Sequence, residues 1–116
     1  IKRIPNELKK LSTDEFCVQY GEALRDAPPD IYQHIGNLSR MFDVESKRRK
    51  LSIQKNLVKS RRIQIGINEC TLFASWGSPQ KSNRTVGAWG SHVQLIYGDF
   101  GPYIYTRNGR VSSFQD

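Results

Sequence analysis

Residues 66–79 read GINECTLFASWGSP and carry the clearest structural signals in the chain. Asn68 is a favoured N-cap residue, and Glu69 places a negative charge at the positive end of a helix dipole. Gly77 can adopt the left-handed conformation that ends a helix, and Pro79 prevents continuation. The apolar stripe of this helix is Leu72, Phe73 and Trp76. The segment therefore predicts a short amphipathic helix over residues 68–76.

Upstream of this segment the sequence predicts two further helices. Ser12 and Glu15 form a capping box at the start of a helix over residues 13–24. Asp30 can cap a second helix, after a break over residues 26–30 that contains two prolines. The apolar positions at helical spacing are Phe16, Cys17, Tyr20 and Leu24 in the first helix and Ile31, Ile35, Leu38 and Phe42 in the second.

Downstream of residue 79 the hydrophobic period changes from helical to alternating. The predicted strands are residues 84–89, 92–97, 103–107 and 110–115. Gly90-Ser91 joins the first two strands, and Asn108-Gly109 joins the last two. Asn-Gly is the strongest short hairpin signal, because a type I′ turn needs two residues at positive φ.

The order of helices followed by strands predicts an α+β fold. We expect two layers, with N-terminal helices packed on a three- to four-stranded antiparallel sheet. The length of 116 residues fits one domain, which we place at residues 11–116. Residues 1–10 are predicted to form an irregular basic arm. No apolar run approaches the roughly 18 residues needed to cross a bilayer.

The last predicted hairpin has two chemically different faces. A two-residue turn pairs Thr106 with Val111, Ile104 with Ser113, and Tyr103 with Phe114. One face then carries Tyr103, Tyr105, Arg107, Arg110 and Phe114, and the other carries Ile104, Thr106 and Val111. Either the aromatic residues pack in the core, or Ile104 and Val111 are buried instead. In the second case the aromatic face is exposed and predicts a protein-binding surface.

The chain is basic, with a formal net charge of +7 and a pI near 9.7. Such a charge favours anionic partners. Residues 44–62 hold much of it and predict a short helix lying on the core with a solvated outer face. The candidate anion-binding residues of this segment are Lys47, Arg48, Arg49, Lys50, Arg61 and Arg62. They could bind the phosphates of nucleic acid or anionic lipid headgroups, or remain solvated without a ligand.

The sequence contains no recognisable catalytic or cofactor motif, so we predict no enzymatic activity, no cofactor and no small-molecule substrate. Asp43 and Glu45 are interpreted as surface carboxylates. A metal site is not expected, since no CxxC occurs and both histidines are far from either cysteine in sequence. Cys17 and Cys70 each fall on an apolar helix face. They are either two small buried side chains or one disulfide that joins two helices.

The second half of the chain resembles the SmpA/OmlA-like family of small envelope lipoprotein domains of Gram-negative bacteria. The resemblance covers residues 63–116 and depends on residues that end helices, form turns and mark strands, not on catalytic residues. The matching residues are Ile65-Gly66-Ile67, Trp76-Gly77-Ser78-Pro79, Asn83-Arg84-Thr85, Gly90, Gln94-Leu95-Ile96-Tyr97, Tyr103-Ile104-Tyr105 and Asn108-Gly109-Arg110-Val111. Ile67 replaces the usual Met of the family, and Leu95 stands where Trp is common.

The resemblance implies an exported interaction module with two helices against a three- or four-stranded antiparallel sheet. The same layout is similar to that of secreted β-lactamase-inhibitor proteins, which bind a protein through the sheet face. It implies a periplasmic or outer-membrane-associated location, and export favours the Cys17–Cys70 disulfide. The leading hypothesis is a non-enzymatic module that binds a protein at the bacterial envelope. The alternative is a small cytoplasmic nucleic-acid-binding or phage-type regulatory protein that uses residues 47–62.

Overall fold

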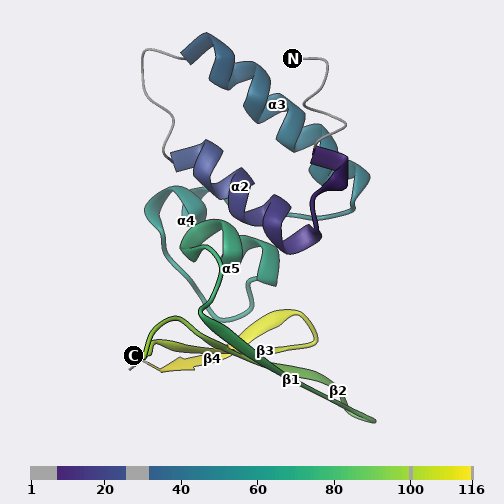
Figure 1. The fold of residues 1–116 in the computed structure, drawn as a ribbon, viewed down its shortest axis with the longest axis vertical. Coiled ribbons are helices and arrows are strands. Elements are labelled where there is room, and N and C mark those ends of the chain that lie inside the picture. Colours follow the sequence, from purple (N-terminus) through teal and green to yellow (C-terminus); the bar gives the residue numbers. More distant parts are fainter. Residues whose placement is uncertain (1–7, 26–31, 100, 116) are drawn as a thin grey trace.

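The computed structural model describes residues 8–25, 32–99 and 101–115 and has the predicted α+β two-layer architecture, with helices stacked on one side of an antiparallel sheet (Figure 1). The helices are α2 (Thr13–Arg25), α3 (Tyr32–Arg48), α4 (Lys55–Ser60) and α5 (Glu69–Trp76). The strands are β1 (Lys81–Gly87), β2 (Gly90–Ile96), β3 (Tyr103–Arg107) and β4 (Arg110–Gln115), in the spatial order β1-β2-β3-β4.

The capping signals read from the sequence are confirmed in α2 and α5. The side chain of Asn68 accepts a hydrogen bond from the Thr71 N–H at 2.8 Å. Ser12 Oγ accepts one from the Glu15 N–H at 3.2 Å. Gly77 follows α5 with a φ of 82°, which is strained for any residue with a Cβ. Local hydrogen bonds between a side chain and the backbone therefore fix where α2 and α5 begin.

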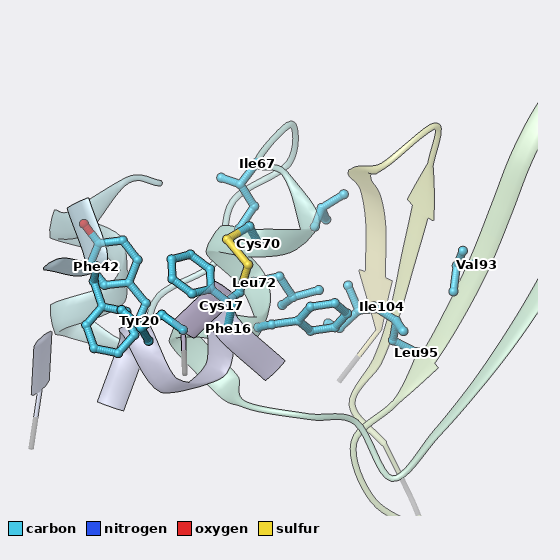
Figure 2. Packing of buried hydrophobic residues seen from close by; sticks show 13 residues of the cluster. Phe16, Cys17, Tyr20, Phe42, Ile67, Cys70, Leu72, Val93, Leu95 and Ile104 are labelled. Carbon is cyan, nitrogen blue, oxygen red and sulfur yellow. A yellow bond between two sulfur atoms is a disulfide. The ribbon is translucent and has the colours of Figure 1, made fainter. Parts of the chain in front are cut away.

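The core lies between α2, α3, α5 and the sheet (Figure 2). Phe16, Tyr20 and Phe42 pack against one another with ring centroids 5.2–5.8 Å apart. A disulfide joins Cys17 of α2 to Cys70 of α5, which is the second of the two alternatives for these cysteines. Gly21 allows the two helices to approach closely, since a Cβ there would lie 1.9 Å from the Ala74 carbonyl oxygen.

Two predictions for the first half of the chain need correction. The arm predicted over residues 1–10 is wrong for residues 8–10, which are helical and bury Leu8 to 4% exposure. Residues 1–7 lie outside the described part of the chain. The predicted helix cap at Asp30 and the apolar residue Ile31 also lie outside it, as do the side chains of Ile35 and Leu38.

The basic segment is not one short helix. α3 continues to Arg48, and Lys50 then adopts a left-handed conformation with a φ of 59°. Residues 51–54 connect to α4, which ends where Arg61 takes a second left-handed conformation with a φ of 55°. The cations predicted to share one helix face are therefore distributed over two helix ends and two turns.

The turn between the first two strands was predicted two residues too late. Ala88 and Trp89 form it, and the register pairs Gly87 with Gly90. Gly90 has a φ of 118° and lies against Asn108, whose side-chain oxygen would be 2.2 Å from an added Cβ. Gly90 is thus the first residue of β2 and not part of the turn. A glycine is needed at this position because Asn108 of the next hairpin crowds it.

Candidate protein-binding face

In the described part of the chain, one face of the sheet is packed against the helices. Its buried residues are Val93 and Leu95 of β2, Ile104 and Thr106 of β3, and Val111 of β4. Leu95 and Ile104 point toward the helices in Figure 2, on the side where Leu72 lies. No helix or strand among residues 8–25, 32–99 and 101–115 covers the opposite face (Figure 1). We therefore treat this second face as the candidate binding surface.

The residues of the uncovered face follow from the strand register. Because side chains alternate across a sheet, those between the buried positions point away from the helices. We call this set the outer face: Asn83 and Thr85 of β1, Trp89 of the turn, His92, Gln94 and Ile96 of β2, and Tyr103, Tyr105 and Arg107 of β3. Of the two alternatives left open for the last hairpin, the structure has the one in which Ile104 and Val111 are buried.

A row of hydrogen bonds crosses the middle of the outer face. Asn83 Nδ2 donates to Gln94 Oε1 at 3.2 Å, and Gln94 Nε2 donates to the Tyr105 hydroxyl oxygen at 3.4 Å. The register places these three residues on directly neighbouring strands. The Tyr105 ring is therefore held in place from its polar end, which reduces the entropy that it would lose on binding.

Trp89 is the outer-face residue that sequence reasoning missed, since it was read as part of a strand. Its side chain is 51% exposed at the tip of the β1–β2 hairpin, and its ring meets His92 edge-on with centroids 5.5 Å apart. A Cβ on Gly87 would lie 2.8 Å from the indole, so the indole lies over Gly87 on the outer face. Gly87 and Gly90, which bracket Ala88-Trp89, are a turn signal that could have placed it.

The sheet carries only positive charge. The ionisable groups of β1, β3 and β4 include Lys81, Arg84, Arg107 and Arg110, and none of the four strands contains Asp or Glu. Arg110 also donates to the Gly66 carbonyl oxygen at 2.9 Å, which fixes its guanidinium near the end of the sheet. By register, Lys81, Arg107 and Arg110 lie on the side of the aromatic rings, whereas Arg84 lies on the helix side. The aromatic side of the strands therefore carries positive charge, which complements an acidic partner.

One of the predicted partner-binding residues, Phe114, lies on the other face. Thr106 pairs with Val111 as predicted, but a β-bulge between Tyr105 and Thr106 places Ile104 opposite Phe114. Tyr103 consequently pairs with Gln115. The extra residue, Ser112, donates its hydroxyl to the Tyr105 carbonyl oxygen at 3.2 Å. Phe114 is 40% exposed on the helix side of the sheet, so it cannot share one patch with Tyr103 and Tyr105.

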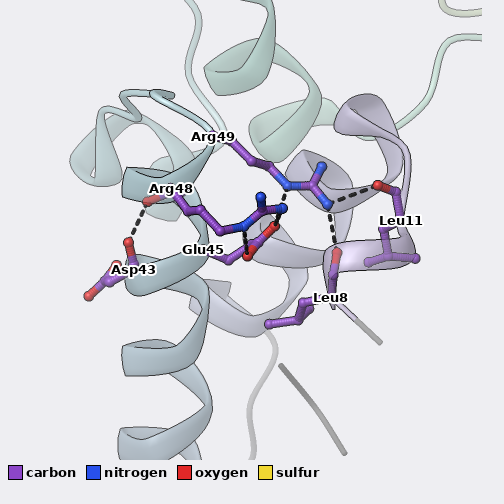
Figure 3. Close-up of polar contacts among 7 residues, drawn as sticks. Leu8, Leu11, Asp43, Glu45, Arg48 and Arg49 are labelled. Carbon is purple, nitrogen blue, oxygen red and sulfur yellow. Dashed lines mark hydrogen bonds and ion pairs between the residues drawn. The ribbon is translucent and has the colours of Figure 1, made fainter. Parts of the chain in front are cut away.

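The predicted anion-binding residues are not all available for a ligand. Glu45, interpreted as a surface carboxylate, is only 4% exposed and binds both Arg48 and Arg49 (Figure 3). Arg49 also donates to the carbonyl oxygens of Leu8 and Leu11 at 2.6 and 2.9 Å. Its guanidinium lies 4.6 Å from the centre of the Phe16 ring. Arg49 therefore holds the first helical residues against α2 and α3.

The Arg48–Glu45–Arg49 cluster also changes the acidity of the carboxylate. Hydrogen bonds from Arg48 and then Arg49 lower the pKa of Glu45 from its ordinary value of 4.5 to about 2, against the opposing effect of burial. Arg48 is half exposed, with a side-chain exposure of 52%. The other predicted anion-binding residues are exposed and lie near the ends of α3 and α4: Lys47, Lys50, Arg61 and Arg62.

The described residues contain no group of three or more potential metal-ligating side chains.

A cavity of about 260 Å³ lies between the helices and the sheet, lined in part by Asp14, Glu69 and Arg84. The Thr106 hydroxyl donates to the Glu69 carboxylate at 2.7 Å, and the Tyr97 hydroxyl donates to the Gly77 carbonyl oxygen at 2.9 Å. Burial raises the pKa of Tyr97, with smaller effects from the charges of Asp14 and Glu69. These contacts join the two layers.

No protein-family model, curated protein or solved structure matches this chain. The resemblance of residues 63–116 to the SmpA/OmlA-like family therefore stays a prediction based on the quoted motifs. The functional argument consequently depends on the geometry and charge of the outer face.

Proposed function

We propose that this chain is a non-enzymatic protein-binding module that binds an acidic partner surface through the outer face of its sheet. The observation that carries the proposal is the uncovered face itself, which gathers Trp89, Tyr103 and Tyr105 on strands without a single carboxylate. Tryptophan, tyrosine and arginine are the residues that most often dominate binding energy at protein interfaces.

The aromatic side chains of the outer face are held in position by their neighbours, which supports a binding role for them. Trp89 is supported from below by Gly87 and from the side by His92. Tyr105 is supported by the hydrogen-bonded row from Asn83 through Gln94. Side chains that are already in one conformation lose less freedom when a partner covers them, so each contact contributes more net affinity.

We further propose that the module acts in an oxidising compartment, at the bacterial envelope. The support is the disulfide between Cys17 and Cys70, since structural disulfides persist mainly in exported proteins. Within the described part of the chain, no helix has the length and hydrophobicity needed to cross a membrane.

Site-specific photo-cross-linking in the native host tests this proposal. A benzophenone amino acid replaces Tyr105 in one variant and the 64% exposed Val44 of α3 in a matched control. The position on the outer face should cross-link to one defined protein, and the α3 position should not. Equal cross-linking from both positions, or cross-linking from Val44 alone, would contradict the proposal.

The identified protein is then purified and titrated against variants of this chain. Trp89→Ala and Tyr105→Ala should each weaken binding about 30-fold, which corresponds to about 2 kcal/mol for a central aromatic contact. Arg107→Glu should slow association and reverse its dependence on salt. Val44→Ala serves as the control for loss of an exposed apolar side chain elsewhere. An unchanged affinity in both aromatic variants would remove the outer face from consideration.

The alternative, anion binding by residues 47–62, receives less support because Arg49 is engaged with Glu45 and with two backbone carbonyl groups. The exposed cations around it remain a candidate site for nucleic acid or anionic lipid. This alternative predicts retention on nucleic acid or on anionic vesicles that weakens steeply as salt rises. Replacing Lys47 and Lys50 together by Gln should abolish that retention. Absent or salt-insensitive retention would exclude it.

A further inference from the structure

The two edges of the sheet differ in how completely their backbone groups are bonded. At the β4 edge, the Gly66 N–H donates to the Val111 carbonyl oxygen at 2.7 Å, and the Val111 N–H donates to the Ile67 carbonyl oxygen at 2.8 Å. Beyond the bulge, β4 pairs with β3 at Ser113, Phe114 and Gln115, so this edge offers only a short length of regular strand. β1 is the other edge strand, pairs regularly with β2 along all seven residues, and is exposed at each of them. Among the described residues, the longer open edge is therefore β1.

The hydrogen bonds of β2 show which backbone groups of β1 point outward. The Asn108 N–H donates to the Ser91 carbonyl oxygen, and the Tyr97 N–H donates to the Pro102 carbonyl oxygen, so odd-numbered residues of β2 bond toward β3. Backbone groups alternate in direction along a strand, so the even-numbered residues bond toward β1. The register therefore directs the N–H and C=O groups of Ser82, Arg84 and Val86 away from the sheet, where no backbone group of another described residue bonds to them.

We infer that the β1 edge binds an extended, acidic segment of the protein partner, which adds to the sheet as a fifth strand. The inference rests on the proposed protein-binding function and specifies how part of the partner is bound. Main-chain hydrogen bonds to Ser82, Arg84 and Val86 would supply affinity, and the side chains of β1 would supply selectivity. The β1–β2 hairpin extends beyond the helices, so a strand laid along β1 meets no helix there (Figure 1).

Charge identifies the chemistry of the added strand. Lys81 and Arg84 are the charged residues of β1, and the described residues place no carboxylate within ion-pair distance of either. Arg84 also lines the cavity that contains Asp14 and Glu69. An acidic residue on the neighbouring strand opposite Arg84 would form a favourable cross-strand pair.

A second copy of this chain fits the edge poorly. Arg84 is the middle residue of β1, which runs from Lys81 to Gly87. Antiparallel pairing of two β1 strands in full register would put Arg84 of one copy opposite Arg84 of the other. Like charges directly opposite each other destabilise a sheet, and charged residues on edge strands commonly prevent such self-association.

Nuclear magnetic resonance on the isotope-labelled full chain tests the inference. The probe is a synthetic nine-residue peptide of alternating Thr and Glu, and the control peptide alternates Thr and Lys. The acidic peptide should slow amide hydrogen exchange at Ser82, Arg84 and Val86. The inward-bonded amides of Asn83 and Thr85 should change little. No slowing at the outward amides, or equal slowing by the basic peptide, would overturn the inference.

Two variants distinguish the contribution of backbone hydrogen bonds to peptide binding from the contribution of charge. Val86→Pro removes an outward N–H at a position where an edge strand tolerates proline, and it should abolish peptide binding, whereas Val86→Thr should retain it. Arg84→Glu should weaken binding of the acidic peptide about fivefold and allow the basic peptide to bind. Unchanged affinity in both Val86→Pro and Arg84→Glu would show that the peptide does not bind this edge.

The same spectra distinguish this inference from the proposed function. A natural partner that perturbs Trp89, Tyr103 and Tyr105 but leaves the β1 amides exchanging freely would overturn strand addition and leave the outer face as the binding site. Protection of the β1 amides with unchanged affinity in Trp89→Ala and Tyr105→Ala would support strand addition and reject the outer face.

Discussion

The helical layer and the β1–β2 hairpin of this chain differ in how deeply their side chains are buried. In the helical layer Phe16, Cys17 and Leu72 are fully buried, and a disulfide and a close helix contact hold α2 against α5. In the hairpin every residue of β1 is exposed, and Trp89 is half exposed at the tip. The residues that stabilise the fold are therefore separate from those that we propose to bind a partner. Single mutations should therefore change stability without changing binding, or binding without changing stability.

The largest expected effect is on stability, from removal of the disulfide. The combined change Cys17→Ala and Cys70→Ala opens a loop with a sequence separation of 53 and should lower the free energy of unfolding by about 4 kcal/mol. Chemical denaturation of the variant and of the oxidised parent measures the difference. Similar midpoints for the two proteins would show that the link contributes little to the helical layer.

A close second is the contact between α2 and α5. Gly21→Ala places a methyl group 1.9 Å from the Ala74 carbonyl oxygen, so the helices must separate. We expect a loss of about 3 kcal/mol, the upper range for overpacking a core. Glu22→Ala, at the exposed neighbouring position, is the control and should change the unfolding midpoint little. Equal stability of Gly21→Ala and the parent would contradict the close approach.

The Arg48–Glu45–Arg49 cluster should give the fold a defined pH dependence. The folded-state pKa of Glu45 is about 2, below its ordinary value of 4.5, so its stabilising effect is complete above pH 4.5 and is lost as the pH falls toward 2. Glu45→Gln should cost about 2 kcal/mol at neutral pH and remove this part of the acid dependence. Thermal unfolding between pH 2 and 7 measures both. A parallel acid dependence in parent and variant would exclude the cluster as its source.

The smallest effect on stability is expected in the hairpin. Trp89→Ala should change the free energy of unfolding by less than about 0.5 kcal/mol, as for most surface substitutions. Gly87→Ala should displace the indole, because the new methyl group would lie 2.8 Å from it, while leaving the tryptophan in the sequence. If ring position matters for binding, both variants lose affinity for the partner at nearly full stability. Retained affinity in Gly87→Ala would show that the observed ring position is not required.

Local signals in the sequence predicted much of the fold. The caps at Ser12 and Asn68, the turn at Asn108-Gly109 and the strands that flank it are confirmed, because each is specified by neighbouring residues. The two-layer arrangement followed from their order. The disulfide could be posed only as one of two alternatives from the residues alone, since pairing depends on how α2 and α5 pack.

The errors came from contacts between distant parts of the chain. The bulge that moves Phe114 to the helix side lies where Val111 also bonds with Gly66 and Ile67, which no hairpin rule includes. Glu45 is buried because Arg49 joins it to carbonyl groups near residue 8. Periodicity predicted neither arrangement. Trp89 was missed for a local reason: the turn was placed at Gly90-Ser91, so Trp89 was assigned to the strand and not to the hairpin tip, where it lies over Gly87 and beside His92.

The most direct test of the separation between the two regions is a paired measurement on the double variant Trp89→Ala, Tyr105→Ala and on Glu45→Gln. For each, the affinity for the cross-linked partner and the melting temperature are measured under the same buffer conditions. We predict that the sheet variant loses partner binding with its melting temperature almost unchanged, and that Glu45→Gln melts earlier but binds normally below its transition. Normal binding by the sheet variant would contradict the assignment of the outer face as the binding site.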